Sequence, residues 1–292
     1  MNILIDLSRI SCPGDLFQEI SPLYSICNQD IHIEIKFEYY NELSYLICLV
    51  AIIRDIRERE NRVLIDCDKN DGYLQRINFF KEMNIDLTES FYRHESTGRF
   101  LEISHITKEN ANDVVKKIIN ILEKQMTLSP DLSGCLNFCV WEVVDNISVH
   151  ANSPIGGYVV AQYYPKNNLI EIVIVDTGCG IYASLTKNPR YSILSEENII
   201  KNSIKKEHTS GDGRGNGLYY TVEFIRENEG KFSLFSGNYK ICLENGNVYT
   251  EKVPYWKGTL VHMKINSDSS PNMRNIFKDE IPTSVEEYSD LF

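Results

Sequence analysis

The sequence lacks a run of apolar residues long enough to cross a membrane. Its most apolar stretch, residues 46–53, is followed by Arg54 and Arg57, whereas a bilayer-spanning helix needs about 20 apolar residues. The first residues, MNILIDLSRIS, carry Asp6 inside the apolar stretch and lack both a basic lead-in and a small-residue cleavage site. They do not resemble a secretory signal peptide. We therefore expect a cytoplasmic protein that makes no membrane contact.

Closely paired cysteines and an excess of positive charge are also missing. The eight cysteines include no C-x-x-C pair, so reduced, buried thiols are expected. Cys135 and Cys139 are interpreted as core residues rather than as zinc ligands, because no fourth ligand is evident. Thirty Lys and Arg stand against 41 Asp and Glu, a formal net charge of -11. This charge disfavours a nucleic acid as the main partner, and none is expected.

The chain has the composition of a folded globular protein, with 42% hydrophobic and 24% charged residues. Its 292 residues favour two domains. The first part alternates strand, helix, strand and helix, over residues 31–38, 43–59, 63–67 and 73–83. The polar stretch 86–99 is the best boundary. We predict a small α/β domain over residues 1–98.

In the second part of the chain, the sequence pattern predicts two helices, a β-hairpin, a glycine-rich loop, a helix and two strands. These elements are expected over residues 108–126, 130–151, 158–164, 169–175, 218–229, 231–236 and 259–265. We predict a second domain over residues 99–267 and an acidic tail over 268–292. The whole chain is assigned to the α/β class, as an α+β sandwich of helices layered on sheets.

Three polar side chains follow one another at a spacing of four residues on the second of these helices: Glu142, Asn146 and His150. Residues four apart lie on one face of a helix. A carboxylate, an amide and an imidazole in this order suit a general base, an oxygen ligand for magnesium and a phosphate contact. A solvated helix face without function explains the same pattern.

A glycine-rich turn follows the apolar strand expected over residues 169–175. It reads Asp176-Thr-Gly178-Cys-Gly180, and such a turn lets the backbone approach a ligand closely. With Ala183 the glycines also match the dinucleotide fingerprint. We interpret that match as coincidental, because a proline and a polar helix stand where the dinucleotide fold needs a helix and a parallel strand. A structural turn that binds no ligand is the other alternative.

A second glycine cluster, residues 211–218 with the sequence GDGRGNGL, runs into an amphipathic helix. Backbone amides at a helix N-terminus form an anion site, to which Arg214 adds a charged contact with phosphate. The segment matches neither the P-loop nor the kinase glycine loop. A flexible loop explains it about as well.

Together these segments resemble the GHKL ATPases, the family of gyrase, the heat-shock chaperone, histidine kinases and the MutL repair protein. Four blocks match in order: residues 142–146 the N box, 176–181 and 211–218 the two glycine boxes, and 257–259 (Lys-Gly-Thr) the last strand. The match covers about residues 107–267. It implies a Bergerat fold, in which helices cover one side of a mixed sheet and ATP binds beneath a lid.

The resemblance also implies roles for individual residues. Asp176 is expected to bind the adenine amino group, Asn146 to hold Mg²⁺ against the phosphates, and Glu142 to activate the attacking oxygen. The glycines of the second box are expected to let the lid close over the phosphates. The full set expected to bind ATP is Asn146, His150, Asp176, Gly178, Gly180, Gly211, Gly213, Arg214, Gly215, Gly217, Leu218 and Thr259.

Within the family, the segment EVVDNISVHA is similar to the N box of anti-sigma-factor serine kinases. The N-terminal part weakly resembles a STAS domain, although Asp66-Cys67-Asp68 stands where the phosphoacceptor Asp-Ser pair of that domain is expected. The resemblance implies a STAS or sigma-factor-like regulator as protein partner. A homodimer is left open.

Three functions follow as hypotheses. The first is a serine/threonine protein kinase or ATPase that uses Mg-ATP and Glu142. The second is a nucleotide-gated interaction module with little turnover. The third is a dinucleotide enzyme built on Gly178. We also expect residues 188–212 to behave as a lid with few apolar contacts.

Overall fold

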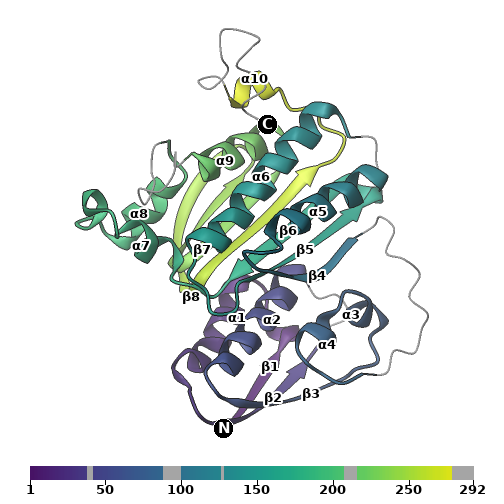
Figure 1. Ribbon diagram of the computed structural model, residues 1–292, viewed down its shortest axis with the longest axis vertical. Helices are drawn as coiled ribbons and strands as arrows, with labels where there is room; N and C mark the ends of the chain where they lie inside the picture. Colours follow the sequence, from purple (N-terminus) through teal and green to yellow (C-terminus); the bar gives the residue numbers. More distant parts are fainter. Residues whose placement is uncertain (38–41, 88–99, 126–127, 207–215, 278–292) are drawn as a thin grey trace.

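The structure, a computed structural model, describes residues 1–37, 42–87, 100–125, 128–206 and 216–277. These residues form two β-sheets with helices packed on their faces (Figure 1). The expected α/β class, with helices layered on sheets, is confirmed. In the part of the chain that is described, no helix is both long and apolar enough to span a bilayer.

The smaller sheet is parallel and has the order β1-β2-β3. Its elements are β1 (Asn2–Asp6), α1 (Pro13–Ile20), β2 (Asp30–Lys36), α2 (Leu43–Glu58), β3 (Arg62–Cys67), α3 (Gly72–Arg76) and α4 (Phe79–Glu82). The expected order of strands and helices is confirmed, but the helix expected over residues 73–83 is broken into α3 and α4 at Asn78, which has a left-handed φ of 64°. The sequence pattern does not predict β1 and α1, which precede these elements. Helix α1 begins at Pro13, which suits a first helical turn, and the Asp15 carboxylate accepts the Ser11 N–H at 2.9 Å.

The larger sheet has five strands in the order β4-β5-β6-β8-β7, and each pair of neighbours is antiparallel. The strands are β4 (Phe100–Ile106), β5 (Gly157–Tyr164), β6 (Leu169–Asp176), β7 (Lys231–Glu244) and β8 (Asn247–Asn266). The resemblance implies a mixed sheet. The described sheet instead has no parallel pair. Tight connections at Pro165–Asn167 and at Asn245-Gly246 account for the antiparallel β5–β6 and β7–β8 pairs, because only antiparallel strands accept such short turns. Strands β7 and β8 are longer than expected, and β4 is not predicted.

Helices cover both faces of the larger sheet. One face carries α5 (Ala111–Gln125), α6 (Pro130–Val149) and α9 (Gly217–Glu227), and the other carries α1 and α2 (Figure 1). Along β6, Ile172 and Ile174 pack into the core beneath α5, α6 and α9. Val173 and Val175 pack into the core beneath α1 and α2. The resemblance implies cover on one side only. The N-terminal helices supply the second cover because a continuously apolar strand has to bury both faces.

Helix α2 lies between the two sheets and is buried on all sides. Every residue from Leu43 to Ile53 is buried, as expected of a helix that is apolar all round. On the same side of the larger sheet, Trp256 of β8 packs against Phe17 of α1, with ring centroids 4.8 Å apart. The two parts of the chain therefore share one core. The predicted boundary at residue 98 lies in a segment, 88–99, outside the described residues.

The beginning of the predicted tail packs against the helices. It contains α10 (Met273–Ile276), whose Ile276 is buried. The Phe277 ring lies 5.2 Å from that of Phe138 in α6 and 4.9 Å from that of Tyr220 in α9, measured between centroids. These aromatic contacts hold the described start of the tail against α6 and α9.

Candidate functional site

Helix α6 and its C-cap carry the three polar residues that the sequence places on one face. The Ser129 hydroxyl caps the helix by accepting the Leu132 N–H at 3.2 Å. Asn146 Nδ2 donates to the Glu142 carbonyl oxygen at 2.7 Å, so the amide nitrogen is used within the helix and the amide oxygen is left for another partner. His150 is the C-cap residue, and all three side chains are half-buried.

Asp176 ends strand β6 and is 1% exposed. Its Oδ1 accepts the Gly178 N–H at 2.7 Å. Burial raises the pKa of Asp176 to about 7, although hydrogen bonds from Gly178 and Thr259 and the charge of Lys257 act in the opposite direction. Away from water, a hydrogen bond between this carboxylate and a ligand donor is stronger than on the surface.

At two positions around Asp176 only glycine fits, because a Cβ atom would clash with neighbouring protein atoms. A Cβ at Gly178 would lie 2.0 Å from the Ala151 carbonyl oxygen, just after α6, and a Cβ at Gly258 would lie 2.6 Å from Asp176 Oδ1. The Cys179 N–H also donates to the Ala151 oxygen at 2.7 Å. Two of the four sequence blocks, residues 176–181 and 257–259, are thus in direct contact, and the turn also touches Ala151, which follows the N box. These contacts suit a ligand site and a purely structural turn equally, because the crowding groups belong to the protein.

Gly180 begins α7 (Gly180–Leu185) with a φ of 73°, a left-handed conformation that favours glycine. The next N–H, that of Ile181, donates to Ser236 Oγ at 2.9 Å, and the Ser236 hydroxyl donates to the Gly258 oxygen at 2.8 Å. Thr259 follows in β8 and hydrogen-bonds Asp176. The structure therefore gathers Gly178, Gly180 and Thr259 around one buried carboxylate.

The second glycine box meets the N box at Glu142 of α6. A Cβ at Gly217, the first residue of α9, would lie 2.0 Å from Glu142 Oε2. The positive end of a helix dipole favours a carboxylate at this place, so Glu142 has a structural contact at the helix start. Leu218 is half-buried and packs into the core under α6.

Four candidate phosphate-binding residues of the second glycine box are not among those that the structure describes: Gly211, Gly213, Arg214 and Gly215. Their contacts with phosphate stay predictions. Glu142 and Asn146 lie one helical turn apart, as the spacing predicts.

The described part of the expected lid is well packed, so the prediction of few apolar contacts is wrong for residues 188–206. This segment forms a 3-10 turn (Pro189–Tyr191) and α8 (Glu196–Ser203). Tyr191 and Ile199 are 3% and 1% exposed and form a small core with Leu185. The Glu196 carboxylate also accepts the Asn238 N–H at 2.9 Å. The sequence pattern hides this core because its members are spread over several short elements.

The dinucleotide fingerprint at Gly178, Gly180 and Ala183 is coincidental. Strand β6 pairs with β5 and β8, both antiparallel, and the helix after it, α7, has six residues. A dinucleotide-binding unit needs a full helix and a parallel strand next to the first. The third hypothesis is therefore set aside.

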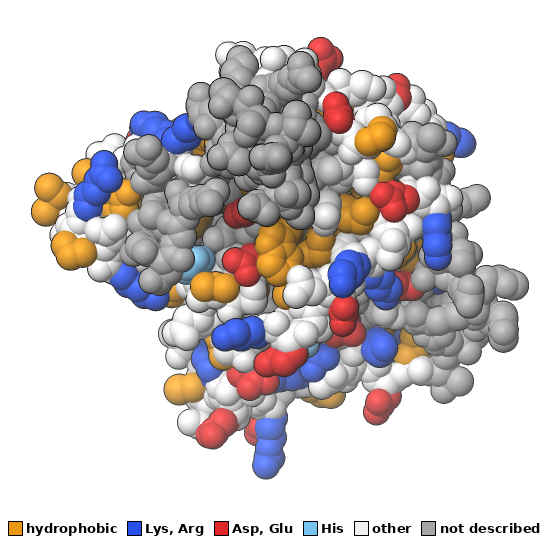
Figure 2. Space-filling view, turned by 45° about the horizontal axis from the view of Figure 1, so that its top comes forward, with side chains coloured by type: hydrophobic (Ala, Val, Ile, Leu, Met, Phe, Trp, Pro, Cys, Tyr) orange, Lys and Arg blue, Asp and Glu red, His pale blue; other side chains and the backbone are white. Residues whose placement is uncertain are grey.

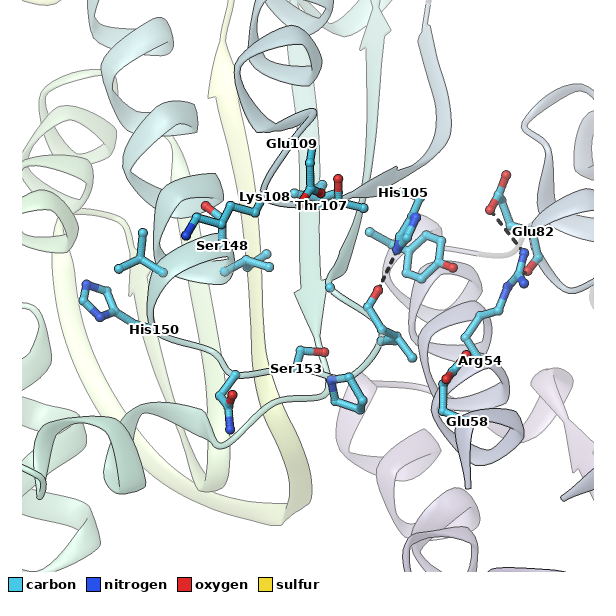
Figure 3. Close-up of a pocket in the computed structure, with 18 of the residues that line it drawn as sticks. Arg54, Glu58, Glu82, His105, Thr107, Lys108, Glu109, Ser148, His150 and Ser153 are labelled. Atoms are coloured by element: carbon cyan, nitrogen blue, oxygen red, sulfur yellow. Dashed lines mark hydrogen bonds and ion pairs between the residues drawn. The ribbon is translucent and has the colours of Figure 1, made fainter. Parts of the chain in front are cut away.

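A pocket of about 760 Å³ lies where the N-terminal part meets the larger sheet and the end of α6 (Figure 3). Its charged and histidine side chains are Arg54, Glu58, Glu82, His105, Lys108, Glu109, His150 and Lys187. His105 Nε2 lies 2.6 Å from the Ile155 carbonyl oxygen. Arg54 Nη2 lies 3.6 Å from Glu82 Oε2, and Figure 3 shows these two side chains pointing toward each other. The sequence does not predict this pocket, because separate segments without a common motif line it. His150 belongs both to the pocket and to the expected ATP set.

Surface charge, the cysteines and possible metal ligands are also subjects of expectations from the sequence. On the face drawn in Figure 2, the described Lys and Arg side chains are interspersed with Asp and Glu. Cys12 and Cys27 are exposed, contrary to the expectation of burial, whereas Cys135 and Cys139 are buried in the core. Burial raises the pKa of Cys135 to about 12. Within the described ranges, no three His, Cys, Asp or Glu residues are grouped to hold a metal ion.

Comparison with known proteins finds no matching family model and no significant match among curated proteins.

Proposed function

We propose that this chain binds Mg-ATP between α6, the turn after β6, strand β8 and the start of α9, and that it acts as a serine/threonine protein kinase or ATPase. The observation that supports this most is Asp176, a buried carboxylate at a strand end with Gly178, Gly180 and Thr259 around it. A buried acceptor of this kind suits the amino group of adenine and disfavours a ring that lacks such a donor.

The residues fit a magnesium ion that is held mainly by phosphates. Mg²⁺ commonly keeps several waters and binds substrate phosphates together with one or two protein oxygens, and the Asn146 amide offers one such oxygen. When bound, the ion would neutralise phosphate charge. Asn146 would orient it, and Glu142 would take the proton of the attacking hydroxyl or water.

A nucleotide-gated interaction module is the second candidate. It is favoured by the contact between the Glu142 carboxylate and Gly217, because a carboxylate that stabilises a helix start serves structure without any turnover. In either case we propose a cytoplasmic protein with a STAS or sigma-factor-like partner, on the resemblance of residues 142–151 to the corresponding kinases.

Calorimetry with Mg-ATP tests the binding proposal. We expect the native protein to bind and Asp176→Asn to bind about ten- to a hundredfold more weakly, since a charged hydrogen bond contributes about 1.5–3 kcal/mol. Asp66→Asn, an exposed carboxylate on β3, is the matched control and should bind as the native protein does. Unchanged affinity in a folded Asp176→Asn protein would contradict the adenine assignment. Transfer of label from γ-labelled ATP into proteins of a cell extract, rather than into free phosphate, distinguishes a kinase from an ATPase.

A further inference from the structure

Asp55 of helix α2 is a fully buried carboxylate, with 0% of its surface exposed. Its Oδ2 accepts from Arg59 Nη2 at 2.8 Å. Its Oδ1 accepts from the Thr177 hydroxyl at 3.1 Å and from Lys257 Nζ at 2.7 Å. A buried carboxylate is costly unless donors compensate for its lost water. Here one oxygen faces its own helix, and the other holds two residues of the larger sheet.

The two residues held by Oδ1 flank the core of the proposed nucleotide site. Thr177 follows Asp176 directly and is fully buried. Lys257 precedes Gly258, where a Cβ would lie 2.6 Å from Asp176 Oδ1. Asp55 therefore holds one side chain from each of the two backbone segments that contact the Asp176 carboxylate. Displacing a binding group by about 1 Å is enough to impair a site.

Arg59 in turn fixes Asp55. Its Nη1 donates to three carbonyl oxygens of the N-terminal part, those of Leu23, Tyr24 and Ile26, at 3.0, 2.8 and 3.1 Å. The Tyr24 hydroxyl accepts the Lys257 N–H at 3.4 Å. A continuous set of hydrogen bonds thus leads from the N-terminal part to the turn that carries Asp176.

We propose that Asp55 is a positioning residue of the nucleotide site, which it shapes through Thr177 and Lys257, so that the N-terminal part sets the affinity for ATP. This inference rests on the proposed function. Stability alone does not explain a buried ion pair, because an apolar replacement of similar volume is often equally stable. A requirement for one fixed arrangement of the Asp176 turn does explain it.

The test compares Asp55→Asn, Thr177→Val and their double variant with the native chain by Mg-ATP calorimetry and by hydrogen exchange without nucleotide. Thr177→Val keeps the shape of the side chain and removes only the donor, so it guards against a failure of Asp55→Asn to fold. The matched control is Tyr73→Phe. The Tyr73 hydroxyl donates to Gln162 Oε1 at 2.7 Å and joins the same two parts of the chain, but at the far end of the β5–β6 pair from Asp176.

We expect both single variants to bind Mg-ATP about tenfold more weakly and to exchange faster over residues 176–181. The double variant should bind no more weakly than Asp55→Asn, because both changes break the same contact between Thr177 and Asp55. Tyr73→Phe should match the native protein. Native affinity in Thr177→Val, or a loss of stability in Asp55→Asn without loss of affinity, overturns the positioning role and leaves ATP binding intact. A native protein that binds no Mg-ATP overturns the proposed function and the positioning role with it.

Discussion

The carboxylate of Glu142 in α6 lies against Gly217, the first residue of α9, where a Cβ would come within 2.0 Å of Oε2. The contact joins the proposed general base to the helix that follows the second glycine box. Any rearrangement of that box that shifts the start of α9 therefore changes the surroundings of Glu142.

Replacing Gly217 by alanine should displace the Glu142 carboxylate rather than unfold the protein. The crowding atom is the end of a flexible side chain, and alanine stabilises a helix by about 0.5–1 kcal/mol relative to glycine. We expect the free energy of unfolding to change by less than about 1 kcal/mol and phosphate release to fall by about a hundredfold. Denaturation and a phosphate assay measure the two effects. Gly72→Ala, at a helix start with no atom near the added Cβ, is the control.

Replacing Glu142 and Asn146 of α6 by alanine, one at a time, should separate nucleotide binding from turnover. Glu142→Ala should keep the native affinity for Mg-ATP and lower phosphoryl transfer by about 10² to 10⁴, as expected for a lost general base. Asn146→Ala should weaken both, because only the amide would contact the metal. Affinity and phosphate release are measured side by side on folded variants. A native rate in Glu142→Ala would favour the nucleotide-gated module, and a loss of affinity in Glu142→Ala would assign both residues to binding.

Affinity for Mg-ATP should increase as the pH rises through about 7. Burial raises the pKa of Asp176 from 3.8 to about 7, and the ionised carboxylate is the stronger acceptor. Stability should change in the opposite direction: the folded state holds this proton more tightly than the unfolded chain does, so the free energy of unfolding falls between about pH 4 and about pH 7. Asp176→Asn should remove this contribution to both profiles. Calorimetry and denaturant unfolding, each at about pH 6 and about pH 8, test the two signs.

The sequence predicts those elements whose periodicity is strong and local. Helices α2 and α6 and the β5–β6 hairpin begin and end within about two residues of their predicted limits. Helix α1 is hidden because Pro13 and Gly14 indicate a break, although Pro13 in fact begins the helix. The long β7–β8 hairpin is hidden because the outer part of β8, residues 247–255, is mostly exposed and contains Pro254.

The candidate site is predictable in its parts but not in its connections. The spacing of Glu142 and Asn146 along the chain reveals their shared helix face. No local pattern connects Asp55 with Thr177, which is 122 positions away. That contact exists because α2 is buried between the two sheets, an arrangement set by tertiary packing rather than by propensity.

Removing residues 1–98 should leave a fragment, 99–292, that does not fold stably. Helices α1 and α2 cover one face of the larger sheet, and their loss would expose Val173 and Val175 of β6 and Trp256 and Leu260 of β8. Burying each such side chain contributes about 1.5–3 kcal/mol, which is large against a total stability of about 5–15 kcal/mol.

For the same reason the whole chain should unfold in one transition. Trp256→Ala in the full chain should lower the free energy of unfolding by about 3–5 kcal/mol, whereas Leu64→Ala, at a side chain that is 67% exposed on β3, should change it by less than about 0.5 kcal/mol. In the Trp256→Ala variant the only tryptophan left is Trp141. Denaturation curves of this variant that coincide when followed by circular dichroism and by Trp141 fluorescence would support one cooperative unit. A soluble fragment 99–292 with its own sharp transition would instead show that the larger sheet folds without its N-terminal cover, and Asp55 would then act across an interface between independently folding domains.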